Sequence, residues 1–97
     1  MVEFQVIEVT DGDTFKVKGN WKMGNATGNL VRPTGYNTPE KEERGYKEAK
    51  QKLTQLILNK TVDVKNIQAI DKHGRLVADI YLEGKNLADY FPEYKKR

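Results

Sequence analysis

Residues 46–64, YKEAKQKLTQLILNKTVDV, contain a single change of hydrophobic period, and this change decides the fold. The first part carries apolar side chains at three- and four-residue spacing, at Tyr46, Ala49, Leu53, Leu56 and Ile57. This spacing, with lysines and glutamines on the opposite face, predicts an amphipathic helix from Tyr46 to Asn59 that packs its apolar stripe in the core. The following Thr61-Val62-Asp63-Val64 alternates with period two, which is typical of a strand.

The segment before this helix predicts three strands. Val2 to Val6 and Thr14 to Lys18 both alternate apolar and polar residues, and the turn between them is Thr10-Asp11-Gly12-Asp13, where we expect Gly12 to supply a positive φ. Residues 19–28, with three glycines and two asparagines, favour a loop. A third strand is expected over residues 29–36, as an edge or bulged strand because it contains a proline.

The segment after the helix completes the pattern. A polar turn, Asp71-Lys72-His73-Gly74, separates the strand that begins at residue 61 from another expected at residues 75–82, and residues 86–91 favour a short helix limited by Pro92. Three strands, a helix and two strands are the element order of an OB barrel. We therefore predict a mainly β fold with helices (α+β): a five-stranded OB-fold-like barrel, with a helix between strands three and four and a short C-terminal helix.

Composition limits the classes of protein and of site. The chain has 97 residues, 37% hydrophobic and 32% charged, and carries a net charge of +3, which fits one domain over residues 1–97 and is compatible with an anionic partner. It has no cysteine and one histidine, so a metal here would need oxygen ligands, which favours calcium or magnesium. We see no signal peptide and no apolar run of ~20 residues, so we expect a cytoplasmic monomer without membrane contact; secretion would require a leader that was removed.

Three short segments concentrate polar residues, and each has two interpretations. Asp11-Gly12-Asp13-Thr14 is either a plain hairpin turn or a source of a cation ligand, the Asp13 carboxylate. Residues 31–40, VRPTGYNTPE, contain either a helix start capped by Asn37, with Glu40 three residues later, or a metal site at Asn37 and Thr38 with a free Glu40 carboxylate. Residues 71–75, DKHGR, are either a polar turn or a guanidinium presented to a phosphate.

Phosphodiester hydrolysis is a reaction that needs these residue types together. Its transition state gains negative charge on the non-bridging oxygens, which a metal ion and planar arginine forks stabilise. A carboxylate must also orient or deprotonate the attacking water. Asp13, Asn37, Thr38, Arg32, Arg75 and Glu40 supply each part.

The segments DGDTFKV, VRPTGYNTPE, GYKEAKQKLTQLILNKTVDV and DKHGRLVADIYLEGKNL together resemble the staphylococcal nuclease (thermonuclease) family in order and spacing, from about Val6 to Leu87. The resemblance implies that Asp13 and Asn37 bind Ca²⁺ through their side chains and Thr38 through its carbonyl oxygen. It implies that Arg32 and Arg75 hold the scissile phosphate, and that Glu40 acts as general base or positions the water. Lys72 and His73 stand where the family contacts substrate phosphate and base.

Two features depart from the family pattern. Asn37 stands where aspartate is usual, which removes one negative charge and should lower the affinity for calcium. The chain also stops soon after its last strand, where the family has a longer helical region that supplies aromatic contacts. Tyr90, Phe91 and Tyr94 could replace part of that region.

From these observations we expect a calcium-dependent endonuclease, a hydrolase of DNA and RNA that prefers single strands. The main alternative is a module of the same fold that binds nucleic acid or a protein ligand without cleaving it. The presence of Arg32, Glu40 and Arg75 favours the enzyme over that alternative. A generic OB-fold single-strand binder would have no need for Glu40 beside two arginines.

Overall fold

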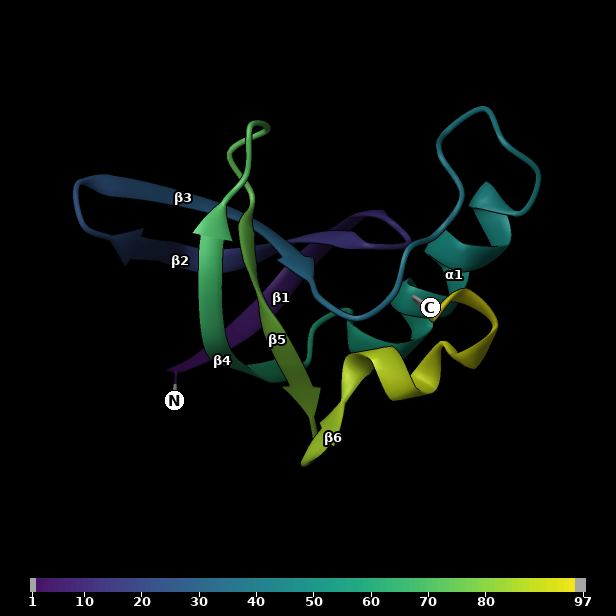
Figure 1. The fold of residues 1–97 in the computed structure, drawn as a ribbon. Coiled ribbons are helices and arrows are strands. Elements are labelled where there is room, and N and C mark those ends of the chain that lie inside the picture. Colours follow the sequence, from purple (N-terminus) through teal and green to yellow (C-terminus); the bar gives the residue numbers. More distant parts are fainter. Residues whose placement is uncertain (1, 96–97) are drawn as a thin grey trace.

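The computed structural model describes residues 2–95, and its centre is a closed five-stranded β-barrel (Figure 1). The strands are β1 (Val2–Asp11), β2 (Thr14–Met23), β3 (Ala26–Pro33), β4 (Thr61–Ile70) and β5 (Leu76–Leu82). They are ordered β3-β2-β1-β4-β5, and a parallel pairing of β3 with β5 closes the barrel. The predicted fold class is confirmed, including the helix between the third and fourth strands.

The helical elements lie on one side of the barrel (Figure 1). Helix α1 (Tyr46–Ile57) ends two residues earlier than the sequence indicated. After β5, a two-residue strand β6 (Lys85–Asn86) leads into two 3-10 helices, η1 (Leu87–Tyr90) and η2 (Pro92–Tyr94). The Asn86 side chain accepts a hydrogen bond from the Ala88 N–H and so caps η1 where a short helix was expected. Within residues 2–95, no helix is long and apolar enough to cross a membrane.

The core forms between the barrel and the inner face of α1. Ala49, Leu53 and Ile57 are buried, which confirms the packing predicted for the apolar stripe, and Leu56 is partly buried against the same cluster. Tyr46 is the exception, because its hydroxyl donates to Asp11 Oδ1 at 2.6 Å instead of being enclosed in the core.

The prediction of a loop over residues 19–28 is wrong. These residues belong to a long β2–β3 hairpin in which Trp21 pairs with Gly28. The Trp21 indole is 4% exposed and donates to the Leu30 carbonyl oxygen at 2.8 Å, and a Cβ on Gly28 would lie 2.9 Å from the indole ring. Gly28 therefore serves close packing against Trp21, which a local loop pattern does not reveal.

The C-terminal segment supports the chain between β3 and α1. The Phe91 ring stacks on Tyr36 with centroids 4.5 Å apart, and the Asn37 N–H donates to the Tyr94 carbonyl oxygen at 2.9 Å. The Tyr36 hydroxyl in turn donates to the Gly12 carbonyl oxygen at 2.9 Å. Aromatic residues near the C-terminus thus help to place the two polar segments that contain Asp13 and Asn37.

Candidate active site

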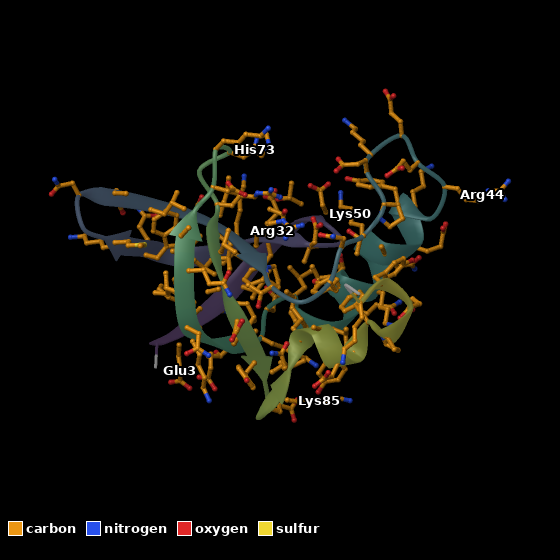
Figure 2. All side chains as sticks on the ribbon, viewed as in Figure 1. Glu3, Arg32, Arg44, Lys50, His73 and Lys85 are labelled. Atoms are coloured by element: carbon orange, nitrogen blue, oxygen red, sulfur yellow. The ribbon has the colours of Figure 1, made fainter. Side chains whose placement is uncertain are left out.

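A polar cavity of about 620 Å³ lies where the β1–β2 turn, the end of β3, the segment before α1 and the β4–β5 turn meet. In Figure 2, Arg32 lies between His73, on the β4–β5 turn, and Lys50, on α1. Of the residues expected from the sequence, six line this cavity: Asp13, Arg32, Thr38, Glu40, His73 and Arg75. Asn37 does not itself line the cavity, but its side chain contacts Arg32, which does. Lys72 is exposed on the turn and does not line the cavity.

The β1–β2 turn brings Asp13 into the cavity because Gly12 lets other segments approach closely. A Cβ on Gly12 would lie 2.7 Å from Ala49 Cβ and 2.8 Å from Thr38 Oγ1. The expectation that Gly12 supplies a positive φ is wrong, since the glycines with positive φ lie elsewhere in the described chain. Gly12 is instead needed so that α1 and the Thr38 segment can pack over the turn.

Arg32 connects the β1–β2 turn to the segment after β3. Its Nη2 donates to Asn37 Oδ1 at 2.5 Å and lies 3.4 Å from Asp13 Oδ2. The Arg32 and Asp13 side chains are 18% and 14% exposed, so their ion pair is partly shielded from water. One guanidinium nitrogen thus lies against both side chains that were expected to bind a metal.

Arg75 is held in place by the β4–β5 turn. Asp71 accepts the Arg75 Nε–H at 2.8 Å through Oδ2, and its Oδ1 accepts the backbone N–H groups of His73 and Arg75 at 2.9 and 3.0 Å. Partial burial raises the pKa of the Asp71 carboxyl, but these hydrogen bonds and the Arg75 charge outweigh it and hold the pKa below its usual value. The turn is therefore both a polar turn and a rigid support for the guanidinium.

Thr14 connects the two halves of the cavity, and the sequence analysis did not single it out. Its hydroxyl is buried, accepts a hydrogen bond from Arg75 Nη1 at 2.9 Å and lies 3.4 Å from Asp13 Oδ1. Within residues 2–95, Arg75 Nη2 makes no hydrogen bond and is available to a ligand. The signal for Thr14 was its position directly after Asp13 in the first motif.

Glu40 lies in an irregular segment and not at a helix start. The capping interpretation of Asn37 is wrong, because α1 begins at Tyr46 with Gly45 before it. Glu40 is exposed, and its N–H donates to Glu43 Oε1 at 2.6 Å. Its own carboxylate makes no hydrogen bond or ion pair within the described residues, so it can act as a base towards water in the cavity.

The oxygen atoms near Arg32 have the chemistry of a weak site for a hard cation. Asp13 and Asn37 direct oxygen atoms towards one positively charged nitrogen, and Thr38 lines the same cavity. Calcium binds carboxylate, amide and carbonyl oxygens, so this donor set fits it, but with only one formal negative charge. In residues 2–95, no three His, Cys, Asp or Glu side chains come together as a metal-binding group.

The cavity lining also includes residues outside the three motifs, among them Lys41, Tyr46 and Lys50. Tyr46 and Lys50 are four residues apart and so share one face of α1. The hydrogen bond to Asp11, with a smaller contribution from burial, raises the pKa of the Tyr46 phenol to about 12. Periodicity assigned Tyr46 to the core and left Lys50 on the solvent side, because it cannot show which segment packs over the helix.

Comparison with known proteins agrees with this architecture. A family model described as Staphylococcal nuclease homologue matches residues 30–91, more than half of the chain and all of the segment from the end of β3 to Phe91. No curated protein matches the sequence significantly. The matched region contains Arg32, Asn37, Glu40 and Arg75 in the barrel arrangement described above. The chain belongs to the staphylococcal nuclease homologue family.

Proposed function

We propose that this protein is a calcium-dependent nuclease that hydrolyses phosphodiester bonds of DNA and RNA and prefers single strands. Family membership points to a nuclease-related function. The observation that carries the finer proposal is the meeting of Arg32, Arg75, Asp13 and Glu40 around one cavity. These side chains come from the β1–β2 turn, β3, the segment before α1 and the β4–β5 turn, so only the folded barrel assembles them.

The two arginines are suited to hold one phosphate. Arg75 is oriented by Asp71 and Thr14 and keeps Nη2 available, and Arg32 reaches the cavity from β3. Planar guanidinium groups present paired donors to phosphate oxygens, and their benefit grows as negative charge develops in the transition state. We therefore assign both arginines to stabilising the transition state.

Glu40 is the base in this proposal. Its carboxylate lines the cavity without a partner in the described chain, so it remains free to accept a proton from water or to orient the water for attack. The exposed position of Glu40 is consistent with access of solvent water to the site.

Asp13, Asn37 and the carbonyl oxygen of Thr38 would hold the calcium ion. A bound calcium ion would supply positive charge next to the phosphate oxygens. Arg32 Nη2 contacts two of these oxygens, so binding of the ion there would require Arg32 to turn away from them, towards the phosphate. The role of Arg32 in binding phosphate is compatible with that movement.

The preference for single strands follows from the position of the cavity. It opens on the outside of a filled barrel, so a substrate must present its backbone and an unstacked base to a surface. His73 at the cavity edge could contact the base, and the exposed Lys72 beside it could contact a phosphate.

One observation favours a second candidate function, a module that binds nucleic acid or a protein ligand without cleavage. The amide of Asn37 contributes no charge and accepts a hydrogen bond from Arg32, so a cation could be held too weakly for catalysis. Retention of Glu40 with both arginines argues for the enzyme.

Incubation with heat-denatured DNA, in calcium or in chelator, distinguishes the two functions. The enzyme should degrade the DNA in calcium and leave it intact in chelator, with slower cleavage of the native duplex. A Glu40→Gln variant, purified in parallel, controls for contaminating nucleases. Binding of denatured DNA without calcium-dependent cleavage would favour the binding module.

A further inference from the structure

Lys50 is a cation in the cavity wall that has no partner in the described chain. It is half-buried, lines the cavity from α1, and forms no ion pair or side-chain hydrogen bond within residues 2–95. The two arginines differ from Lys50 because each already has partners. Arg32 contacts Asp13 and Asn37, and Arg75 contacts Asp71 and Thr14. Lys50 therefore has its charge available to an incoming anion.

The packing of α1 fixes the direction in which Lys50 projects. The neighbouring Ala49 is buried beneath Gly12, and Leu53 is fully buried. Tyr46, one turn before Lys50, is tied to the β1–β2 turn by its hydrogen bond to Asp11. Rotation of α1 would expose these buried side chains. The helix is therefore fixed in an orientation in which the Lys50 side chain leaves it towards the cavity.

The other lysines on α1 do not share this position. Lys47 is exposed and does not line the cavity. Lys52 contacts the Glu93 carboxylate at 3.0 Å and lies 4.7 Å from the centroid of the Phe91 ring, so it is committed to the C-terminal segment. Lys50 is the lysine of this helix that combines a cavity position with a free charge in the described chain.

Lys50 does not serve to neutralise one of the carboxylates that line the cavity. Asp11 accepts the Tyr46 hydroxyl, Asp13 contacts Arg32, and Glu40 comes from the segment before the helix. None of these carboxylates lies within ion-pair distance of the Lys50 ammonium. A lysine on a flexible stem is well suited to a phosphate whose position differs between substrates.

We propose that Lys50 binds a non-scissile backbone phosphate of a single-stranded nucleic acid, on the α1 side of the two arginines. The strand crosses the cavity between the His73 turn and α1, with Arg32 between them (Figure 2). The substrate class is then an oligonucleotide with a phosphate beyond the scissile one, and a single phosphodiester lacks the group that Lys50 recognises. This inference rests on the proposed nuclease function.

The test compares Lys50→Gln with Lys47→Gln, which removes the same charge from the same helix outside the cavity. Affinity for a fluorescent single-stranded oligonucleotide is measured by anisotropy in chelator, over a series of salt concentrations. Lys50→Gln should weaken binding by about three- to tenfold and reduce the slope of log K against log salt by about 0.7, the loss of one contact to a single-strand phosphate. Lys47→Gln should change both quantities much less, and Lys50→Arg should retain most of the affinity.

Kinetics in calcium separate phosphate binding from a structural role. For the oligonucleotide, Lys50→Gln should raise KM and leave kcat nearly unchanged, and the rise in KM should be much smaller for a chromogenic single phosphodiester, which has no second phosphate. If the parent protein binds and cleaves DNA but Lys50→Gln and Lys47→Gln have equal effects, the role of Lys50 is overturned and the proposed function is not. A parent protein that neither binds nor cleaves the oligonucleotide would overturn the proposed function and this inference with it. Thermal melting of each variant establishes that the comparison is between folded proteins.

Discussion

Nη2 of Arg32 lies 2.5 Å from Oδ1 of Asn37, and the same nitrogen lies 3.4 Å from Oδ2 of Asp13. A guanidinium proposed to bind phosphate therefore contacts two oxygens proposed to bind calcium. A cation bound by these oxygens would compete with Arg32 for them, and a phosphate that attracts Arg32 would leave them available. The charge at residue 37 should consequently control how strongly the site binds calcium.

Asn37→Asp should bind calcium more tightly than the parent, because a second carboxylate adds attraction that an amide oxygen lacks. Isothermal titration calorimetry of the two proteins with calcium measures this difference. Asn25→Asp, which adds the same charge at the exposed β2–β3 turn, serves as control. Tighter binding by the parent than by Asn37→Asp would contradict the assignment of residue 37 as a ligand.

Arg32→Lys and Arg75→Lys should each lower kcat by about a hundredfold or more, while affinity for single-stranded DNA falls much less. Lysine keeps the charge but not the planar fork, so interactions that strengthen in the transition state are lost. Turnover in calcium and affinity in chelator are measured on the same preparations. A proportional loss of rate and affinity would indicate that the arginines only bind substrate.

Glu40→Gln should reduce kcat by roughly a hundredfold or more while leaving affinity for DNA unchanged or higher. The amide cannot take a proton from water, and loss of a negative charge near a phosphate eases binding. Glu42→Gln is the matched control, since Glu42 is exposed in the same segment and does not line the cavity. Similar rates for the two variants would remove Glu40 from the mechanism.

Leu53→Ala should destabilise the protein by roughly 2–5 kcal/mol, because it removes a fully buried side chain and leaves a cavity between α1 and the barrel. Urea unfolding followed by circular dichroism gives the free energy of unfolding. Ile67→Ala provides the comparison, since Ile67 is 44% exposed and its truncation should cost much less. Equal costs at the two positions would be inconsistent with the packing described for α1.

Asp71 should make the protein less stable in acid. Its pKa is lower in the folded state than in the unfolded chain, so the folded state favours the ionised form. The resulting stabilisation is fully present above about pH 4 and is lost as the pH falls through the lower pKa of the folded protein. Urea midpoints measured from pH 7 to pH 2 should fall less steeply for Asp71→Asn than for the parent, although this variant should be less stable at pH 7.

The order of the five barrel strands, of α1 and of a short helix after them was predicted from the sequence alone. The change of period within residues 46–64 identified α1 and β4, and the alternation at Val2–Val6 and Thr14–Lys18 identified the first hairpin. These patterns depend on residues a few positions apart, which is why a single chain reveals them. The three polar motifs are also short segments that can be recognised locally. The fold brings Asp13, Arg32, Glu40 and Arg75 from these motifs to one cavity.

Tertiary structure decided what depends on residues distant in the chain. Gly28 was assigned to a loop because its contact with Trp21 is invisible to local pattern, and Gly12 is required by Ala49 and Thr38 rather than by its own φ. The helical pattern assigns Lys50 to the solvent-facing side of α1, and only the packing of α1 over the β1–β2 turn places it in the wall of the cavity that the arginines also line. Sequence patterns reveal which face of a helix or strand is apolar. Which other segment packs against that face depends on contacts between residues distant in the chain, and so on the tertiary structure.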